Sequence, residues 1–175
     1  MNRTARPTVL IFMGVTGTGK STVGALFAEN SGAAFFEGDD FHSLENVEKM
    51  RNGIPLTDAD RAPWLAALRD VIVQALATNT FTVLTCSALK ASYRETLAAS
   101  DPRVQFVHLT GSPEVIAARL QNRPGHFMPP ALLSSQLATL EPPPDALIFN
   151  CEESPESIAA KLLHRLNRVD GFKRF

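Results

Sequence analysis

The eight residues Gly14–Ser21 constrain the fold of this chain more than any other segment. They read GVTGTGKS and fit the phosphate-binding pattern G-x-x-x-x-G-K-[ST]. The residues before them, Thr8–Met13, form a short apolar run with β-branched side chains, which is typical of a buried strand. The residues after them, up to Asn30, carry apolar side chains at helical spacing. The alternative is a glycine-rich turn that serves packing alone, but such a turn would need neither Lys20 nor the hydroxyl of Ser21.

The chemistry of a phosphate site explains this spacing. Gly14, Gly17 and Gly19 let the backbone aim several N–H groups inward, and the N-terminus of the following helix adds partial positive charge. Lys20 adds a full charge that can reach the β- and γ-phosphates, and the Ser21 hydroxyl can bind Mg²⁺. We assign nucleotide binding to the loop and the residue after it, namely Gly14, Val15, Thr16, Gly17, Thr18, Gly19, Lys20, Ser21 and Thr22.

Length and charge bound the remaining classes of function. A chain of 175 residues is most simply one domain, 1–175. Its 17 Lys and Arg residues balance 18 Asp and Glu residues, so no general field attracts nucleic acid or a membrane.

Cys86 and Cys151 form no metal-ligand pattern and are expected to be free thiols, with Cys86 a buried apolar residue. Because the first apolar run is too short to span a bilayer and is not a signal peptide, we expect a cytoplasmic protein.

Strand-like and helix-like segments alternate along the chain, which predicts an α/β fold with a parallel sheet and helices on both faces. The expected strands are Val9–Met13, Ala33–Phe36, Phe81–Cys86, Val104–Leu109 and Ala146–Phe149. The expected helices are Ser21–Asn30, Leu44–Arg51, Asp60–Thr78, Lys90–Ala99, Pro113–Arg123, Pro130–Leu140 and Pro155–Leu166. The tail from Arg168 to Phe175 is expected to be loosely ordered.

An acidic segment follows the second expected strand, at the edge where ligands of such sheets bind. Glu37, Asp39 and Asp40 repel one another, so a cation must compensate them. In an extended segment Glu37 and Asp39 point one way and Asp40 the other. Phosphoryl transfer needs a carboxylate that orients or deprotonates the attacking hydroxyl, and others that hold Mg²⁺ through water. We assign Asp39 as the base, with Asp40 as the open alternative; a solvated acidic turn is the non-functional interpretation.

The segment that follows contains Arg61, whose guanidinium can bind a carboxylate of a small substrate in bidentate fashion. A salt bridge to Asp58 is the alternative for Arg61. Asp58 or Asp60 can also cap the next helix. Trp64, the only tryptophan, is expected to pack in the core rather than to stack on a ligand.

Blocks along nearly the whole chain, from about Val9 to Leu166, resemble the gluconokinase family. The phosphate loop alone would indicate only a broad superfamily, whereas the PLTD, DR and PWL residues within 55–65 are much more specific. The other matching blocks are Gly38–His42, Lys49-Met50, Ser87–Lys90, Tyr93-Arg94, residues 119–123, Gly125–Met128, Ser135-Gln136 and Leu140–Pro142. Two positions depart from the family pattern: Glu37 stands where Asp is expected, and Ser43 where Pro often follows the histidine.

The resemblance implies a P-loop fold similar to that of nucleoside-monophosphate and shikimate kinases, with a five-stranded parallel sheet and a mobile lid at about 119–130. It implies ATP-dependent phosphorylation of D-gluconate at its terminal hydroxyl, with Mg²⁺, and commonly a homodimer. A kinase for another small hydroxy acid such as shikimate is the alternative enzyme. A nucleotide-binding sensor without turnover is the alternative from another class, and ADP release that depends on gluconate separates the two.

Basic side chains complete the expected site. Arg119 and Arg123 lie four residues apart and would repel unless phosphate oxygens lie between them; two solvated arginines are the alternative. We assign Lys20, Asp39, Arg119 and Arg123 to catalysis, and both arginines also to ATP. Metal binding is assigned to Ser21, Glu37 and Asp40. The expected substrate contacts are Asp39, His42, Arg61, Lys90, Arg94 and His126.

Overall fold

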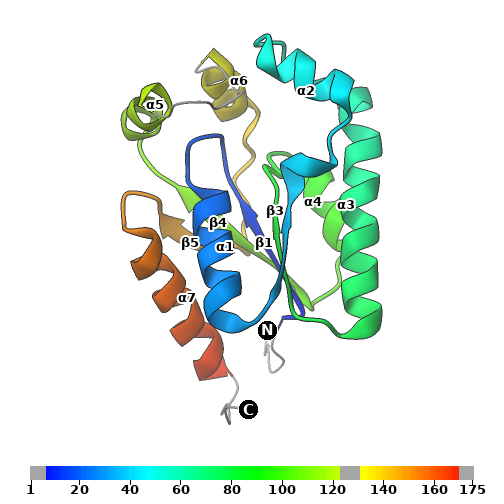
Figure 1. The fold of residues 1–175 in the computed structure, drawn as a ribbon, viewed down its shortest axis with the longest axis vertical. Coiled ribbons are helices and arrows are strands. Elements are labelled where there is room, and N and C mark those ends of the chain that lie inside the picture. The colour runs from blue at the N-terminus through cyan, green and yellow to red at the C-terminus, as the bar shows by residue number, and fades with distance from the viewer. Residues whose placement is uncertain (1–6, 123–130, 170–175) are drawn as a thin grey trace.

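A five-stranded parallel sheet forms the centre of the computed structural model, which describes residues 7–122 and 131–169 (Figure 1). Its strands run in the order β2-β3-β1-β4-β5, and all neighbours are parallel. The strands are β1 (Val9–Met13), β2 (Ala34–Glu37), β3 (Thr82–Thr85), β4 (Val104–Thr110) and β5 (Leu147–Asn150). The predicted α/β class and parallel sheet are confirmed, and each strand lies within one residue of its expected bounds.

Seven helices are described, together with one 3₁₀ turn that the sequence did not predict. They are α1 (Lys20–Ser31), η1 (Gly38–Phe41), α2 (Leu44–Arg51), α3 (Asp58–Thr78), α4 (Ala91–Ala98), α5 (Pro113–Gln121), α6 (Ala131–Thr139) and α7 (Pro155–Val169). Helix α3 begins two residues earlier than expected because Thr57 and Asp60 form a capping box. Arg168 lies within α7, so the expected loose tail is wrong at its start; residues 170–175 lie outside the described residues.

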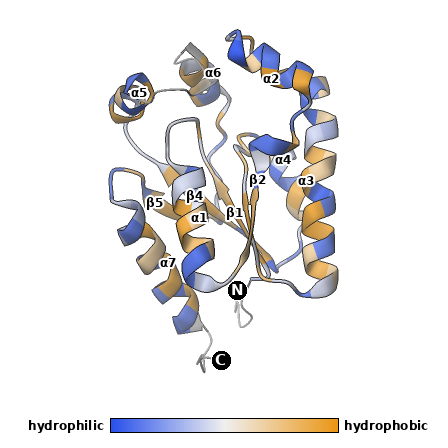
Figure 2. Ribbon diagram, in the orientation of Figure 1, coloured by the Kyte–Doolittle hydropathy of each residue, from blue (hydrophilic) through white to orange (hydrophobic). Residues whose placement is uncertain are grey.

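The two faces of the sheet bury separate cores, because side chains alternate along each strand. Leu10 and Phe12 of β1 point to the core that packs against α1 and α7. Val9, Ile11 and Met13 point to the core that packs against α3 and α4. Figure 2 shows the hydrophobic central strands enclosed between helices that carry both hydrophobic and hydrophilic bands.

Three helices gather around the carboxyl end of the sheet. In Figure 1, α5, α6 and α2 lie along the upper end, above the loop that joins β1 to α1. Leu133 of α6 belongs to the core of the α1 face, while Leu132 packs with Met50 and Leu56 in a small separate cluster. Helix α6 is thereby fixed between the phosphate loop and the segment that joins α2 to α3.

Candidate active site

The phosphate loop takes the backbone conformation that its glycines predict. Gly14, Gly17 and Gly19 all have positive φ, between 83° and 137°. A Cβ atom at Gly14 would lie 2.4 Å from the carbonyl oxygen of Leu109, so a side chain is excluded there. Lys20 heads α1, and its Nζ donates to the carbonyl oxygen of Val15 at 3.0 Å, folding the lysine over the loop.

Two cavities flank this loop, and Gly17, Gly19 and Thr22 line both of them. The first cavity, on the side of α3, is lined by polar and charged groups that include Lys20, Ser21, Asp39, His42, Arg61 and Gln136. The second cavity, on the side of α5 and α7, is lined largely by apolar groups such as Val23, Val115, Leu120 and Ile158, with Arg119 beside them. The loop therefore has a polar side and a largely apolar side.

The η1 turn places Asp39 in the first cavity. The Gly38 N–H donates to Thr85 Oγ1 at 3.1 Å, and Trp64 Nε1 donates to the Gly38 carbonyl at 2.7 Å. A Cβ atom at Gly38 would lie 1.9 Å from the Thr85 carbonyl oxygen, so the turn needs glycine. The side-chain alternation of an extended segment therefore does not apply here, because this packing bends the segment into a 3₁₀ turn.

Burial raises the pKa of Asp39 above its usual value, and the charges of Glu37 and Asp40 raise it further. Lys20 opposes this shift, since its positive charge favours the ionised carboxylate. A carboxylate with a raised pKa beside a lysine is chemically able to accept a proton from a hydroxyl.

The other two carboxylates of the acidic segment do not line the first cavity. Glu37 accepts a hydrogen bond from the Thr85 hydroxyl, and Asp40 is exposed. Within residues 7–122 and 131–169, no three His, Cys, Asp or Glu side chains are placed to hold a metal ion together. Of the three carboxylates, Asp39 is the one that lines the cavity together with Ser21; the metal roles expected of Glu37 and Asp40 stay predictions.

His42 follows the turn and stacks on Trp64, with ring centroids 4.4 Å apart and an interplanar angle of 11°. Burial, and secondarily the charge of Arg61, lowers the pKa of His42 to about 4, so its ring is neutral at pH 7. Its Nδ1 is buried without a hydrogen-bond partner among the described residues. Trp64 is only 2% exposed, and its predicted role in packing is confirmed.

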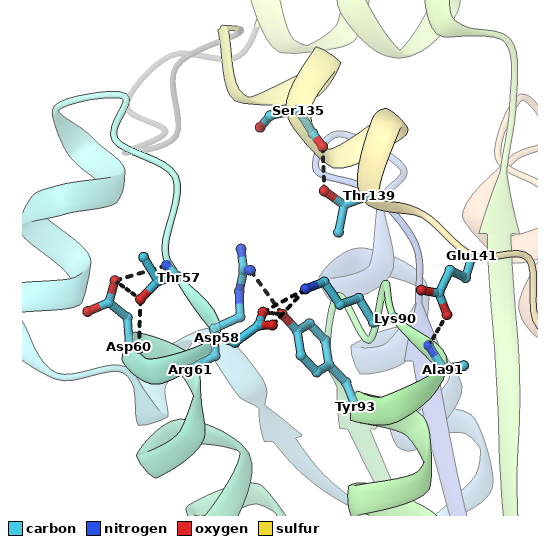
Figure 3. A network of polar contacts seen from close by, with 10 residues as sticks. All are labelled: Thr57, Asp58, Asp60, Arg61, Lys90, Ala91, Tyr93, Ser135, Thr139 and Glu141. Atoms are coloured by element: carbon cyan, nitrogen blue, oxygen red, sulfur yellow. Dashed lines mark hydrogen bonds and ion pairs between the residues drawn. The ribbon is translucent and has the colours of Figure 1, made fainter.

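A polar network joins the start of α3 to α4 (Figure 3). Lys90 Nζ donates to both carboxylate oxygens of Asp58 at 2.8 Å, and the Tyr93 hydroxyl donates to the same carboxylate. Arg61 Nη1 donates to the Tyr93 hydroxyl at 3.3 Å, and its guanidinium carbon lies 5.7 Å from the Tyr93 ring centroid. The expected alternative, a salt bridge from Arg61 to Asp58, is not among the ion pairs of the described residues; Lys90 takes that carboxylate instead.

Arg94 does not reach the first cavity. Its side chain is buried, and Nη1 donates to the carbonyl oxygens of Ala88 and Leu89 at 2.9 and 3.1 Å. These contacts hold the loop after β3, where Ala88 has a positive φ of 45°. The arrangement argues against the expected substrate contact, because the guanidinium is committed to the backbone. Ser87, in the same loop, does line the first cavity.

Gln136 lines the first cavity and was not expected there. Its Oε1 accepts a hydrogen bond from the Thr16 N–H at 2.7 Å, which joins α6 to the phosphate loop. Spacing along the sequence could not reveal this contact, since 120 residues separate the two partners. The one sequence feature that pointed to Gln136 was the Ser135-Gln136 pair, which is among the blocks that resemble the gluconokinase family.

Two expected site residues, Arg123 and His126, lie outside the described residues, as does most of the expected lid. Helix α5 ends at Gln121, and Arg119 is exposed at the second cavity. Cys86 and Cys151 are both free, as predicted, and Cys86 is buried as expected; Cys151 is buried as well. Burial raises the pKa of the Cys86 thiol to about 12. In the part of the chain that the structure describes, no helix is both long and apolar enough to span a membrane.

Comparison with known proteins gives consistent matches over most of the chain. Residues 9–143 match a family described as AAA domain. A gluconokinase of Gluconobacter oxydans is 48% identical over 168 residues, with 94% of each chain covered. The thermoresistant gluconokinase of Escherichia coli is 38% identical, with 91% of this chain and 94% of that protein covered.

Solved structures agree with these matches. A gluconokinase from Sinorhizobium meliloti superposes with a TM-score of 0.82 at 45% identity, covering 94% of this chain and 95% of that one. An unliganded sugar kinase from Janibacter gives a TM-score of 0.85 at 42% identity, covering 95% and 99%. Shikimate kinase from Aquifex aeolicus, at 20% identity and a TM-score of 0.57 over 91% and 96% of the two chains, shares the fold alone.

Proposed function

The chain belongs to the gluconokinase family, and we propose that it transfers the terminal phosphoryl group of ATP to D-gluconate in the first cavity. The observation that carries the site is the position of this cavity. Its lining includes Lys20 and Ser21 of the phosphate loop together with Asp39 and Arg61. A phosphoryl donor and a carboxylate-bearing acceptor can therefore meet there.

The nucleotide lies across the loop in this proposal. The largely apolar second cavity, of about 590 Å³, suits the nucleoside, while the phosphates follow the loop N–H groups towards Lys20. Arg119, which lines the second cavity, meets the phosphate chain in this proposal. Catalysis of phosphoryl transfer rests on such positioning and charge stabilisation rather than on covalent chemistry with the protein.

Asp39 orients the attacking hydroxyl of the acceptor and takes its proton. Arg61 pairs with the acceptor carboxylate, which places the far end of the six-carbon chain at the phosphoryl group. His42, which is neutral and lines the same cavity, makes a hydrogen bond with an acceptor hydroxyl through its ring. Its buried Nδ1 has no partner among the described residues, which costs free energy, and this contact would recover that cost. The product is 6-phospho-D-gluconate.

Magnesium fits the residues present. Mg²⁺ prefers one or two protein oxygens completed by water and substrate phosphates, and the Ser21 hydroxyl and the Asp39 carboxylate line the same cavity. When bound with ATP, the ion neutralises charge on the phosphate oxygens. The two residues would hold it directly or through water.

The first cavity is narrow, with a volume of about 50 Å³. This is room for a few water molecules and not for a six-carbon sugar acid. We infer that acceptor binding moves these walls apart, and the cluster of Met50, Leu56 and Leu132 is where α2, the segment that joins α2 to α3, and α6 meet.

The proposal also includes a cellular compartment and an oligomeric state. Two free thiols favour a reducing compartment and hence the cytoplasm. Homodimers are common in the family that the sequence resembles, and we propose one here. Gel filtration with light scattering would test the oligomeric state.

A coupled ADP-release assay tests the proposed activity. With ATP and Mg²⁺, ADP should form in the presence of D-gluconate and remain near background without it, and ³¹P NMR should place the new phosphate ester on the terminal hydroxyl. A protein that binds ATP but releases no ADP with gluconate would be a nucleotide sensor instead.

A further inference from the structure

The polar network between α3 and α4 is built from two pairs of residues, each pair three positions apart (Figure 3). Asp58 and Arg61 lie in the first turn of α3, and Lys90 and Tyr93 lie at the start of α4. Residues three apart lie on the same side of a helix, so each pair can present both of its side chains to the other pair. Tyr93 interacts with each of the other three residues.

The hydroxyl of Tyr93 has a defined direction of hydrogen bonding. A phenol carries one O–H donor, and its oxygen can also accept. The proton is donated to the Asp58 carboxylate, which can only accept because Lys90 lowers the pKa of Asp58 and keeps it ionised. Towards Arg61 the hydroxyl is therefore an acceptor, and Arg61 Nη1 donates to it at 3.3 Å.

The ring of Tyr93 is fixed as well. Tyr93 is only 5% exposed and belongs to the core that packs against α3 and α4. The guanidinium carbon of Arg61 lies over this ring, 5.7 Å from its centroid, and Lys90 Nζ lies 5.4 Å from the same centroid. A cation over an aromatic face is attracted to it. A rigid, buried side chain therefore supports the Arg61 guanidinium through both its ring and its hydroxyl.

Of the four residues in this network, Arg61 is the one that lines the first cavity. Its charge contributes to the lowered pKa of His42, which lines the same cavity. Tyr93, Asp58 and Lys90 do not line this cavity. An effect of Tyr93 on a ligand bound there must therefore pass through Arg61.

The orientation of a guanidinium decides how well it binds a carboxylate. A bidentate pair needs two parallel N–H groups aimed at the two carboxylate oxygens. A long side chain that is mobile before binding loses rotamer freedom when the ligand fixes it, and this loss weakens binding. A guanidinium that Tyr93 already holds loses less.

We propose that Tyr93 is a positioning residue for the acceptor. Its hydroxyl accepts from Arg61 and donates to Asp58, and this fixes the guanidinium in the orientation that pairs with the acceptor carboxylate. The inference rests on the proposed function for the role of Arg61. Tyr93 itself makes no contact with the acceptor in this arrangement.

Four variants test this role. Tyr93→Phe removes the hydroxyl and keeps the buried ring, so its unfolding temperature should stay within a few degrees of the wild type. Thr96→Val is the matched control, because it removes an exposed hydroxyl of the same helix that donates to the Ser92 carbonyl. Arg61→Ala and the double variant with Tyr93→Phe complete a cycle that measures whether Tyr93 acts through Arg61.

The readout is the steady-state rate of ADP release with gluconate varied at saturating ATP and Mg²⁺. Tyr93→Phe should raise KM for gluconate by about 3- to 10-fold, which corresponds to the cost of ordering one long side chain. Its kcat should stay within about twofold, because only binding is weakened. In the Arg61→Ala background the same substitution should change KM by less than about twofold. Thr96→Val should match the wild type.

The outcomes separate this inference from the proposed function. If the wild type phosphorylates gluconate and Arg61→Ala raises KM, an unchanged KM in Tyr93→Phe would overturn the role of Tyr93 alone. An equal rise of KM in both backgrounds would do the same, since it would indicate a structural effect independent of Arg61. A wild type that releases no ADP with gluconate, or an Arg61→Ala variant with the wild-type KM, would overturn the proposed function and this inference with it.

Discussion

Lys90 donates hydrogen bonds to both carboxylate oxygens of Asp58, at 2.8 Å each. The pair is largely exposed, with 65% of the Asp58 side chain accessible, so it contributes little to stability. Its consequence is electrostatic, because Lys90 neutralises a carboxylate that also interacts with the charge of Arg61. The pKa of Asp58 is lowered by Lys90 and then by Tyr93, so Asp58 stays ionised and committed to these partners. Arg61, which donates to the Tyr93 hydroxyl, is the residue that we propose pairs with the acceptor carboxylate.

Replacing Arg61 should impair acceptor binding selectively. Arg61→Ala should raise KM for gluconate by about 10- to 100-fold, as expected when a charged hydrogen-bond partner is lost, while KM for ATP stays near its starting value. Steady-state kinetics with each substrate varied in turn measure both constants. Arg165→Ala, exposed on α7, is the matched control. An unchanged KM for gluconate would move the carboxylate contact to Lys90.

Replacing Lys20 should abolish turnover without unfolding the protein. In the structure the Lys20 ammonium makes a hydrogen bond to the Val15 carbonyl, a contact that is modest in energy. Lys20→Ala should therefore keep the unfolding temperature within a few degrees. Its kcat should fall by about 10³-fold or more, because a charge partner of the transition state is lost. Near-normal turnover would refute the assignment of the phosphate site.

Asp39→Asn should affect activity and stability in opposite directions. Without a proton acceptor, kcat should fall by about 10²–10⁴-fold, with ATP affinity little changed. Because the pKa of Asp39 is raised by folding, its ionised form destabilises the folded protein, and this cost grows as pH rises from the unfolded pKa through the folded one. At pH 7 the variant should melt at a higher temperature than the wild type in the absence of ligands.

Asp40→Asn is the control for both effects, since Asp40 is exposed and does not line the first cavity. It should change kcat by less than about tenfold, as a surface charge near a site does. A larger loss of activity in Asp40→Asn than in Asp39→Asn would reverse the assignment of the base.

The neutral ring of His42 predicts a loss of stability in mild acid. Its pKa is lowered to about 4, against 6.5 in an unfolded chain, so the unfolded state binds an extra proton between these values. The stabilising contribution is fully present above about pH 6.5 and is lost as the pH falls towards 4. The fall in unfolding temperature from pH 7.5 to 5.0 should be a few degrees smaller in His42→Asn.

His108 must be controlled in that experiment, because burial lowers its pKa as well. Comparing His42→Asn with His108→Asn and the double variant assigns the acid sensitivity to each ring. Identical pH dependence in the wild type and in His42→Asn would show that the ring of His42 is not shielded from protonation.

Local patterns were enough to predict the strands and the phosphate loop. Apolar runs such as Val9–Met13 are buried on both faces, so their composition alone identifies them, and the glycines of the loop are required by its own backbone. The local sequence of the loop is therefore enough to predict its conformation. The family resemblance added the specific PLTD, DR and PWL residues within 55–65.

Long-range packing decided what the sequence could not predict. The 3₁₀ turn at Gly38 depends on Thr85 and Trp64, which are distant in sequence, so local patterns did not predict its geometry. Arg94 and Lys90 are alike in sequence terms, yet one is buried against backbone carbonyls and the other lies beside Asp58. Such differences arise from tertiary contacts that composition and spacing do not contain.

Acceptor discrimination tests the central claim most directly. The purified protein should be assayed for ADP release with ATP, Mg²⁺ and, in separate reactions, D-gluconate, D-glucose or shikimate. In this account Arg61 pairs with the carboxylate of gluconate. Glucose has no carboxylate and would leave the arginine unpaired. D-gluconate should therefore be phosphorylated, and D-glucose should give essentially no ADP. Shikimate carries a carboxylate but is a rigid ring, and we expect at most a trace of turnover. Robust phosphorylation of glucose, or turnover with shikimate that exceeds turnover with gluconate, would contradict this account.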